Sequence, residues 1–433
     1  MDTSANFRKF TLPNGLTVFL YKMDGVMSAS AILFVRTGAI FEKEEDRGIS
    51  HLIEHSAFVG TKKFPSSSEV SNFAENLGIL YNGGTSKDNT SYTLKSPSIN
   101  FSKGLEMLAE FVFNPILDEQ QVLKEKEIIL SEFNDFWNDP IRRFDHVMFE
   151  KRFARPNHPY ARRPMGVPET IKNLSLRKVA EYRSKFYNPT NMVLSIAGNF
   201  DENIENTVKD LFGIQGKGGV SEEPKFNPND YSDFVLYNQE DKRPQISFNI
   251  NFPAFGWLEA DKRERTKLGL LSTILGSARS SRLFSRLREK DKLVYKITSG
   301  WGLLAWLGSL SINGSVSSEK LVQTVDTIKE EIENLIKNGV KENELELSKN
   351  FTIAQVMMQF DNPGVIARYF GEQTFYDEEL WSPERRIEEI QKITKADLDV
   401  LASKIFNFTK VNIGFLGDVP KAIVNEVEKV FKK

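Results

Sequence analysis

Two of the four histidines in this 433-residue chain fall within one five-residue string, His51-Leu52-Ile53-Glu54-His55. On a helix, residues four apart lie on one face, so both imidazoles can reach one metal ion. Glu54 lies on the same side, where its carboxylate can contact a water bound to that ion. Two neutral nitrogen ligands and a carboxylate base are what zinc-dependent hydrolysis requires. The competing interpretation, two surface histidines with a solvated glutamate, has to explain a string that rarely arises by chance.

A catalytic zinc also needs a third protein ligand and one open position. The chain has no cysteine, and the other two histidines, His146 and His158, are distant in the sequence. We therefore expect an Asp or Glu from another helix as the third ligand. Glu125 and Glu132 are seven residues apart and share one helical face, so one can bind metal while the other supports it. An ordinary charged helix face is the alternative.

The sequence around these residues resembles a known family. His-x-x-Glu-His is the inverted zinc motif of the inverzincins. The segment GISHLIEHSAFVGTKKFPSSSEVSNFAENLGILYNGGTSKDNTSYTLK is similar to pitrilysin, insulin-degrading enzyme and the mitochondrial processing peptidases. In that family a Glu separated from the second His by 76 residues is the third ligand, which here is Glu132. The resemblance implies that His51, His55 and Glu132 hold zinc. Glu54 is then the catalytic base, and Glu125 supports the site.

The resemblance extends over nearly the whole chain. HPYARRPMGVPETIKNLS and YNPTNMVLSIAGNF match the middle region of the family. ILGSARSSRLFSRLREKDKLVY matches a run that ends in an Arg and a Tyr seven residues apart, here Arg288 and Tyr295. In the family this pair contacts the substrate carbonyl and helps to hold the developing oxyanion. The alternative is that both belong to ordinary helix and strand surface.

A predicted hairpin departs from the family pattern at the strand that would receive the substrate. Relatives often read Asn-Ala-x-Thr there, whereas this chain has Asn82-Gly83-Gly84-Thr85. In the family this edge strand binds the peptide through backbone hydrogen bonds, so the resemblance makes Asn82, Gly83 and Gly84 substrate-binding residues. Two glycines keep the backbone accessible but make the edge more flexible and less selective. We therefore expect a changed substrate preference and unaffected metal binding.

The elements that must position these residues follow an order that occurs twice. Each half reads as strands, helices, a hairpin, long helices and a late strand, which predicts an α+β fold of two similar α/β-sandwich halves. The resemblance implies the metallohydrolase fold of LuxS and the mitochondrial processing peptidases. In the first half we expect strands at 11–21, 28–37 and 192–197, helices at 48–59, 67–77, 98–113 and 118–137, and a hairpin over 81–95. In the second half we expect strands at 233–238, 245–252 and 411–416, a β pair over 293–315, and helices at 259–275, 281–289, 318–337 and 342–359.

A segment rich in Gly, Pro and Asn, residues 213–232, is the best linker in the chain. We therefore expect a zinc-binding domain at 1–212 and a second domain at 233–433 that supplies substrate contacts. Large members of the family join four such domains into a clam-shaped chamber, and small members complete it by pairing. The resemblance thus implies a homodimer or a heterodimer with a related chain.

Composition excludes several functional classes. Lys and Arg number 57 and Asp and Glu 59, for a net charge of −2, which argues against a nucleic-acid binder or a polybasic membrane anchor. Without cysteine there are no disulfides, thiolate zinc sites or cysteine nucleophiles. The first residues have no apolar signal core, and no stretch is apolar enough to span a membrane. We expect a cytoplasmic protein, although a chain that had lost a targeting segment would look the same.

These observations predict a zinc-dependent endopeptidase that hydrolyses peptides or unfolded segments. The first alternative is a non-catalytic or partner-dependent subunit of a peptidase-like complex, as in respiratory-complex relatives that usually lose motif residues. The second is a zinc hydrolase acting on another bond. No nucleotide motif supports it, because the Gly-rich stretch 213–219 lacks the Lys-Ser/Thr ending of a P-loop.

Overall fold

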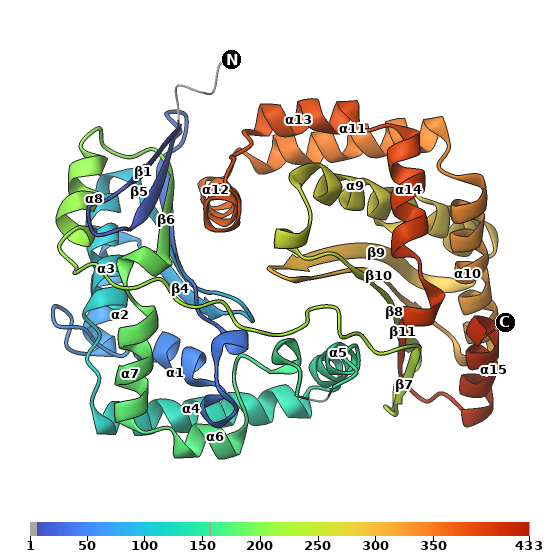
Figure 1. Ribbon diagram of the computed structural model, residues 1–433, viewed down its shortest axis with the longest axis horizontal. Coiled ribbons are helices and arrows are strands. Elements are labelled where there is room, and N and C mark those ends of the chain that lie inside the picture. Colours follow the sequence, from blue (N-terminus) through green and yellow to red (C-terminus); the bar gives the residue numbers. More distant parts are fainter. Residues whose placement is uncertain (1–6, 156, 433) are drawn as a thin grey trace. The chain divides into compact units, whose positions relative to one another are not determined.

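The computed structural model describes residues 7–155 and 157–432, which form two compact units (Figure 1). Unit 1 gathers the described parts of Met1–Phe136, Arg162–Phe226 and Gln359–Ser382, and unit 2 those of Trp137–Ala161, Asn227–Met358 and Pro383–Lys433. Each unit thus contains a segment from the other half of the sequence. The domain boundaries expected around residues 213–232 stay a prediction.

Unit 1 is built on a six-stranded sheet with the order β1-β2-β6-β3-β5-β4. Strands β2 and β6 are parallel, and the other neighbours are antiparallel. Every residue of β6 is buried, as expected for an apolar strand in the middle of a sheet covered on both faces. The strands are β1 (Phe7–Thr11), β2 (Thr17–Lys22), β3 (Ser28–Val35), β4 (Leu80–Thr85), β5 (Thr90–Pro97) and β6 (Met192–Gly198).

Several helices form the main core of unit 1 with one face of this sheet. They are α1 (Ile49–Ser56), α2 (Ser67–Leu77), α3 (Phe101–Phe113), α4 (Glu119–Asn138), α6 (Pro168–Asn173), α7 (Leu176–Phe186) and α8 (Ile204–Phe212). Helix α4 begins in unit 1, and its last two residues belong to unit 2. The long apolar stripe of α3 explains its place in the core, since eight of its residues are buried.

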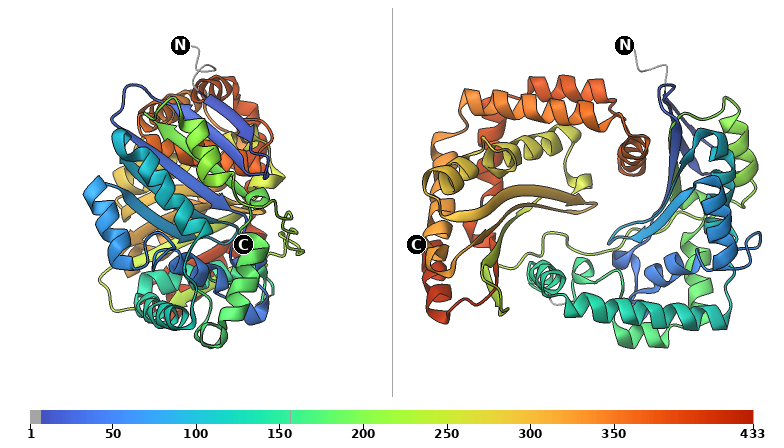
Figure 2. Two further views of the ribbon diagram at one scale, coloured as in Figure 1. Left: turned by 90° about the vertical axis from the view of Figure 1, so that its left-hand side faces the viewer. Right: turned by 180° about the vertical axis from the view of Figure 1, so that it is seen from behind.

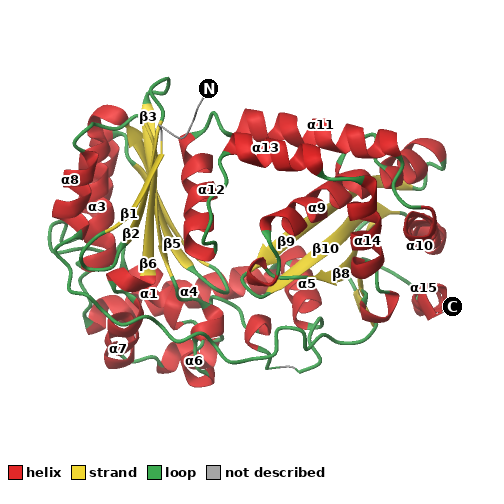
Figure 3. Ribbon diagram, turned by 45° about the horizontal axis from the view of Figure 1, so that its top comes forward, coloured by secondary structure: helices red, strands yellow, loops and turns green. Residues whose placement is uncertain are grey.

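The opposite face of the unit 1 sheet is covered by α12 (Pro363–Tyr376), a helix from the second half of the chain (Figures 2 and 3). Phe370 of α12 is fully buried, and its ring stacks on Phe19 of β2 at a centroid distance of 4.3 Å. Tyr21 and Phe34 of the sheet join the same apolar cluster. The sheet that carries the predicted site therefore depends on a distant part of the sequence.

Unit 2 repeats the topology of unit 1. Its five strands have the order β7-β11-β8-β10-β9, with β7 and β11 parallel and the remaining neighbours antiparallel. This is the arrangement of unit 1 without β1, so the predicted α+β fold of two similar halves is confirmed. The strands are β7 (Val235–Gln239), β8 (Ile246–Ala254), β9 (Val294–Leu304), β10 (Leu307–Val316) and β11 (Asn412–Leu416).

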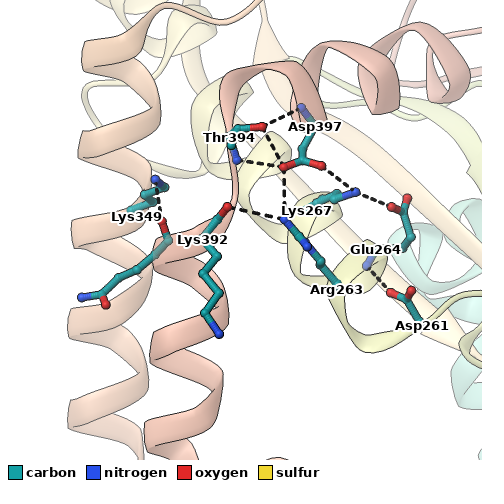
Figure 4. A network of polar contacts seen from close by, with 9 residues as sticks. Asp261, Arg263, Glu264, Lys267, Lys349, Lys392, Thr394 and Asp397 are labelled. Carbon is teal, nitrogen blue, oxygen red and sulfur yellow. Dashed lines mark hydrogen bonds and ion pairs between the residues drawn. The ribbon is translucent and has the colours of Figure 1, made fainter.

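Helices also cover the sheet of unit 2. They are α5 (Pro140–Glu150), α9 (Lys262–Ser272), α10 (Leu321–Asn338), α11 (Glu342–Gln359), α13 (Pro383–Lys392), α14 (Lys395–Ile405) and α15 (Lys421–Lys432). Helix α5 comes from the first half of the chain and packs Phe144 and Met148 against Leu416 of β11. Polar contacts tie the helices together (Figure 4): Lys267 of α9 bridges Glu264 and Asp397 of α14.

Most elements expected from the sequence are present, including the first hairpin, which closes through a Ser86 N–H to Asn89 carbonyl hydrogen bond of 2.7 Å. Two expected helices were inaccurate in part. The helix expected at 259–275 is α9 followed by a π-helix, Thr273–Ser277. The helix expected at 281–289 is a π-helix, Phe284–Lys290, in which the Asp291 N–H donates to the Arg286 carbonyl five residues back. Among the described residues, no helix is both long and apolar enough to cross a membrane.

Helix α1 starts in an unusual way. Its N-cap, Gly48, has a left-handed backbone with φ of 93° and no side chain to accept a hydrogen bond. The buried Glu42 does so instead: its two carboxylate oxygens accept the N–H groups of Gly48 at 2.8 Å and Ser50 at 3.0 Å. The Ser50 hydroxyl in turn contacts the Tyr182 hydroxyl at 3.1 Å. Glu42 thereby fixes the residue at which α1 begins, and hence the direction of every side chain on it.

We predict that Glu42→Ala lowers the free energy of unfolding by about 2–4 kcal/mol, because it leaves two buried N–H groups without an acceptor. Denaturant unfolding monitored by circular dichroism measures the change. The matched control is Glu45→Ala, which removes an exposed carboxylate from the same turn and should change stability by less than about 0.5 kcal/mol. Equal stability of both variants would contradict the capping role.

Candidate metal centre

The structure brings His51, His55 and Glu132 together. One ligand atom from each lies within 4.8 Å of the others. The two imidazole rings project from the same face of α1, with centroids 4.4 Å apart. The His51 and His55 Nε2 atoms lie 4.0 and 3.5 Å from Oε2 of Glu132 on α4. Residue spacing on two packed helices is therefore sufficient to gather three ligand atoms.

These three residues fit a zinc ion. Bonds of 2.0–2.2 Å in a tetrahedral site place ligand atoms about 3.4 Å from one another, close to the separations from Glu132. The donor set of two imidazole nitrogens and one carboxylate oxygen is that of a catalytic zinc with a fourth position open. His51 and His55 are mostly buried, whereas the Glu132 side chain is 44% exposed, so one side of the group is accessible to solvent.

Glu125 lies on the same face of α4 as Glu132 but approaches the histidines from a different side. Its carboxylate is buried and lies 3.2 Å from Nδ1 of His55, behind the ring. Acceptance of the Nδ1 proton would fix the tautomer in which Nε2 of His55 carries the free lone pair. Of the two carboxylates that sequence spacing left as alternatives, Glu132 thus lies with the two histidines as a candidate ligand, whereas Glu125 contacts the Nδ1 side of His55.

Electrostatics also prepares the histidines for metal. Burial, together with the neighbouring His55, lowers the pKa of His51 to about 3, so its imidazole is neutral at neutral pH. Burial also acts to lower the pKa of His55, but the hydrogen bond with Glu125 and the charges of Glu54 and Glu132 outweigh it and raise that pKa. A proton on His55 therefore competes with a metal ion for the same ring nitrogen.

Glu54 lies beside the ligand group, with Oε2 3.8 Å from Nε2 of His51. The Thr85 hydroxyl donates to the same oxygen at 3.2 Å. Burial raises the pKa of Glu54, against the opposing influence of His55 and Thr85. A buried carboxylate with a raised pKa next to a group of candidate metal ligands is well suited to exchanging protons near neutral pH.

Gly83 of β4 makes room for the Glu54 carboxylate. A Cβ atom at position 83 would lie 2.3 Å from Oε1 of Glu54 and 2.8 Å from a ring carbon of Phe58. Gly84, by contrast, has no atom within 4 Å of the corresponding position. The first of the two glycines is therefore required by the present position of Glu54, and the second is not.

β4 is an edge strand, so part of its backbone has no partner strand. The hydrogen bond from the Ser86 N–H to the Asn89 carbonyl fixes which residue pairs of the hairpin are hydrogen-bonded and which are not. In this alternation, the backbone groups of Asn82 and Gly84 bond to β5. Gly83 then occupies a non-hydrogen-bonded position, and its N–H and C=O groups point to the free edge. The same residue thus contacts Glu54 on one side and offers backbone hydrogen bonds on the other.

Arg288 and Tyr295 belong to unit 2, so their approach to the metal group stays a prediction. Arg288 lies in the π-helix, and its guanidinium donates to the Val294 carbonyl at 3.0 Å. Tyr295 is 55% exposed on the edge strand β9. The register with β10 slips at this point, since Lys296 pairs with Ser315 and Val294 with Val316, which leaves Tyr295 in a β-bulge. Bulges commonly redirect a side chain near functional sites.

The sequence did not predict that Glu42 and Thr85 contribute to the site, or that Gly83 contacts Glu54. Thr85 stands directly after the two glycines, but nothing in its spacing relates it to Glu54, which is 31 residues away. A signal for Glu42 existed in the sequence, because a helix whose N-cap is Gly48 needs an acceptor from elsewhere. The sequence does not show, however, which acidic residue supplies that hydrogen-bond acceptor.

Comparisons with known proteins agree with this geometry. Residues 18–158 match the family described as insulinase (peptidase family M16), and residues 173–351 match the peptidase M16 inactive domain. An uncharacterized zinc protease of Rickettsia bellii is 28% identical over 405 residues, which is 93% of this chain and 95% of that protein. The mitochondrial-processing peptidase subunit beta of Dictyostelium discoideum is 25% identical over 422 residues, covering 94% and 88% of the two chains.

Solved structures show the same fold. The crystal structure of a protease from Helicobacter pylori has a TM-score of 0.84 at 22% identity, covering 95% of this chain and 99% of that one. The peptidase M16 inactive domain from Pseudomonas fluorescens also has a TM-score of 0.84, at 20% identity and with 96% and 98% coverage. Both halves of the sequence match models of one family, and the relatives match over most of their length. Together with the convergence of His51, His55 and Glu132 in space, this shows that the chain belongs to peptidase family M16.

Proposed function

We propose that this protein is a zinc-dependent endopeptidase that hydrolyses peptides or unfolded protein segments. The observation that carries the proposal is the convergence of His51, His55 and Glu132, with Glu54 beside them. Relatives named as zinc proteases support the same conclusion. The proposed ligands are His51, His55 and Glu132, and the proposed base is Glu54.

Zinc held by these ligands would polarise the scissile carbonyl and acidify a water, lowering its pKa to ~7. Glu54 would accept a proton from the attacking water and would return it to the leaving amine nitrogen. Glu125 keeps His55 in the ligating tautomer throughout. The raised pKa of Glu54 makes the carboxylate a stronger base toward water, and the carboxylic acid that results is still acidic enough to protonate the far more basic leaving amine.

The proposed substrate is an extended peptide that adds to the free edge of β4. Gly83 offers N–H and C=O groups there and adjoins Glu54, so a strand bound at this edge is directed toward the base. Asn82 and Gly84, proposed from the sequence as substrate-binding residues, flank Gly83 but pair their own backbone groups with β5. Recognition through the backbone of Gly83 requires no particular substrate side chain. Backbone recognition of this kind favours unfolded segments over folded proteins.

A partner-dependent subunit remains the alternative function. The similarity to a processing peptidase beta subunit favours it, because such a subunit is one component of a larger enzyme. All residues of the zinc motif are nevertheless present in this chain. The two functions differ in whether the purified chain hydrolyses peptides alone. The cytoplasmic location expected from the sequence stays a prediction.

We predict that Glu54→Gln retains zinc and loses roughly 10²–10⁴-fold in kcat, because the amide is similar in shape but cannot accept the proton of water. Metal analysis and a fluorogenic peptide assay on the same sample provide the test. His55→Ala is the companion variant, in which both zinc and activity should be lost. A Glu54→Gln protein that binds zinc and turns over at the wild-type rate would exclude Glu54 as the base.

Tyr295→Phe tests the proposed contribution of unit 2. If the hydroxyl donates to the oxyanion, kcat should fall about 10²–10³-fold with zinc content unchanged and a smaller effect on KM. The side chain is more than half exposed, so the melting temperature should hardly change. A wild-type kcat would mean that Tyr295 does not take part in the chemistry.

We further propose that the active species is a dimer, either of two identical chains or with a related chain. Two α+β units per chain give four per dimer, which is the number that the long members of the family are expected to join. Light scattering on active homogeneous protein should give about twice the chain mass of 49.4 kDa. Full activity from a monomer would contradict the homodimer.

A further inference from the structure

Unit 2 contains a cavity of about 370 Å³ between the end of the π-helix Phe284–Lys290 and the start of β9. Its polar lining comes from Arg288, Lys292, Tyr295, Ser317 and Lys320. Two buried apolar residues at the start of β9, Leu293 and Val294, complete the wall. No acidic side chain lines it. A hollow surrounded by three cations, a phenol and a hydroxyl is a place for an anion.

No salt bridge joins the three cations to a carboxylate within the described part of the chain, and the charge of the neighbouring Glu319 acts only on Lys320. Arg288 uses one N–H on the Val294 carbonyl, and Lys320 donates to the Lys292 carbonyl at 3.0 Å. Both acceptors are neutral carbonyl groups, so neither contact neutralises a positive charge. Each of these side chains therefore has hydrogen-bonding capacity and charge for a ligand.

Nearby acids are engaged elsewhere. Arg286, which is not part of the cavity lining, forms ion pairs with Asp291 at 2.6 Å and Glu331 at 3.5 Å. Glu319 accepts a hydrogen bond from Ser317 and lies outside the cavity lining. Arg286 thus neutralises acids that could otherwise pair with the cavity cations.

The backbone around the cavity is irregular at three consecutive points. A π-helix ends at Lys290, Lys292 has a positive φ of 50°, and Tyr295 lies in the β-bulge. Among the described residues, Lys292 is alone among non-glycine residues in having a positive φ. Such conformations cost free energy and cluster at ligand-binding positions. Here they turn Lys292 and Tyr295 toward the same hollow.

We propose that this cavity binds the side-chain carboxylate of an Asp or Glu residue of the peptide substrate. This inference rests on the proposed peptidase function and specifies its substrates. The apolar wall of Leu293 and Val294 suits the methylene stem of an acidic side chain, whereas a free inorganic anion gains nothing from it. Lys292 and Lys320 then select the substrate, and they stand beside Arg288 and Tyr295, the pair proposed to act on the scissile carbonyl.

The test uses full-length zinc-loaded Glu54→Gln protein, which binds peptide without turning it over. Matched extended peptides carry Glu or Gln at one position at a time, and isothermal titration calorimetry gives Kd for each. One position should bind the Glu peptide roughly five- to twentyfold more tightly than its Gln counterpart, the effect of two or three partly exposed ion pairs. The preference should fade between about 50 mM and 0.5 M salt.

Lys292→Gln combined with Lys320→Gln should abolish this preference. The control carries Lys404→Gln and Lys421→Gln, which remove the same charge from exposed positions elsewhere in unit 2 and should preserve it. Equal Kd values for Glu and Gln peptides at every position, or a preference that survives loss of Lys292 and Lys320, would overturn the proposal.

Inorganic phosphate distinguishes a peptide carboxylate from a free anion. Phosphate that competes with the Glu peptide supports one shared cavity, whereas phosphate binding without any Glu preference overturns the substrate assignment. The peptidase function is judged separately. If the wild-type protein cleaves peptides but shows no Glu preference, only this inference is wrong. If the protein prefers Glu peptides in binding but the wild type does not cleave them, only the proposed peptidase function is wrong.

Discussion

Three carboxylates and two imidazoles are held against one another between α1, α4 and β4, partly removed from water. Glu54, Glu125 and Glu132 all lie within 4 Å of a histidine nitrogen. Desolvation keeps His51 neutral, so even a proton on His55 balances at most one of the three negative charges. Carboxylates gathered in this way are unfavourable unless a cation joins them. The repulsion between these carboxylates favours metal binding, because a divalent metal ion balances their charge and can be coordinated by the free nitrogen lone pairs.

The supporting structure depends on contacts between distant parts of the sequence. Helix α12 covers the second face of the unit 1 sheet, and α5 does the same for unit 2. Phe370 is buried against Phe19, so a fragment ending before α12 would expose the aromatic face of the sheet on which the site is built. The two halves of the sequence are thus similar in topology but not separable into two independent cores.

Sequence alone predicted the parts of the site that local spacing controls. Helical periodicity placed His51 and His55 on one face, and it placed Glu125 and Glu132 on one face of a second helix. The order of strands and helices predicted two similar α+β halves. Spacing could not separate the roles of Glu125 and Glu132, since that depends on which ring nitrogen each carboxylate approaches.

Long-range packing accounts for what the sequence did not predict. Glu42 reaches the start of α1 across a turn, Thr85 and Gly83 meet Glu54 from another strand, and α5 and α12 each join the other half's sheet. None of these contacts leaves a periodic pattern. The irregular backbone from Lys290 to Tyr295 was likewise hidden, because the π-helix that precedes it is only seven residues long, too short for its apolar spacing to differ recognisably from that of an α-helix.

The most direct test of this account is the zinc content of three purified proteins: wild type, Glu132→Gln and Glu125→Gln. The account predicts about one zinc per wild-type chain and its loss in Glu132→Gln. In Glu125→Gln, where only the support of His55 is weakened, zinc should remain bound with about 10–100-fold lower affinity. Stoichiometric zinc of unchanged affinity in Glu132→Gln would contradict the proposed ligand set.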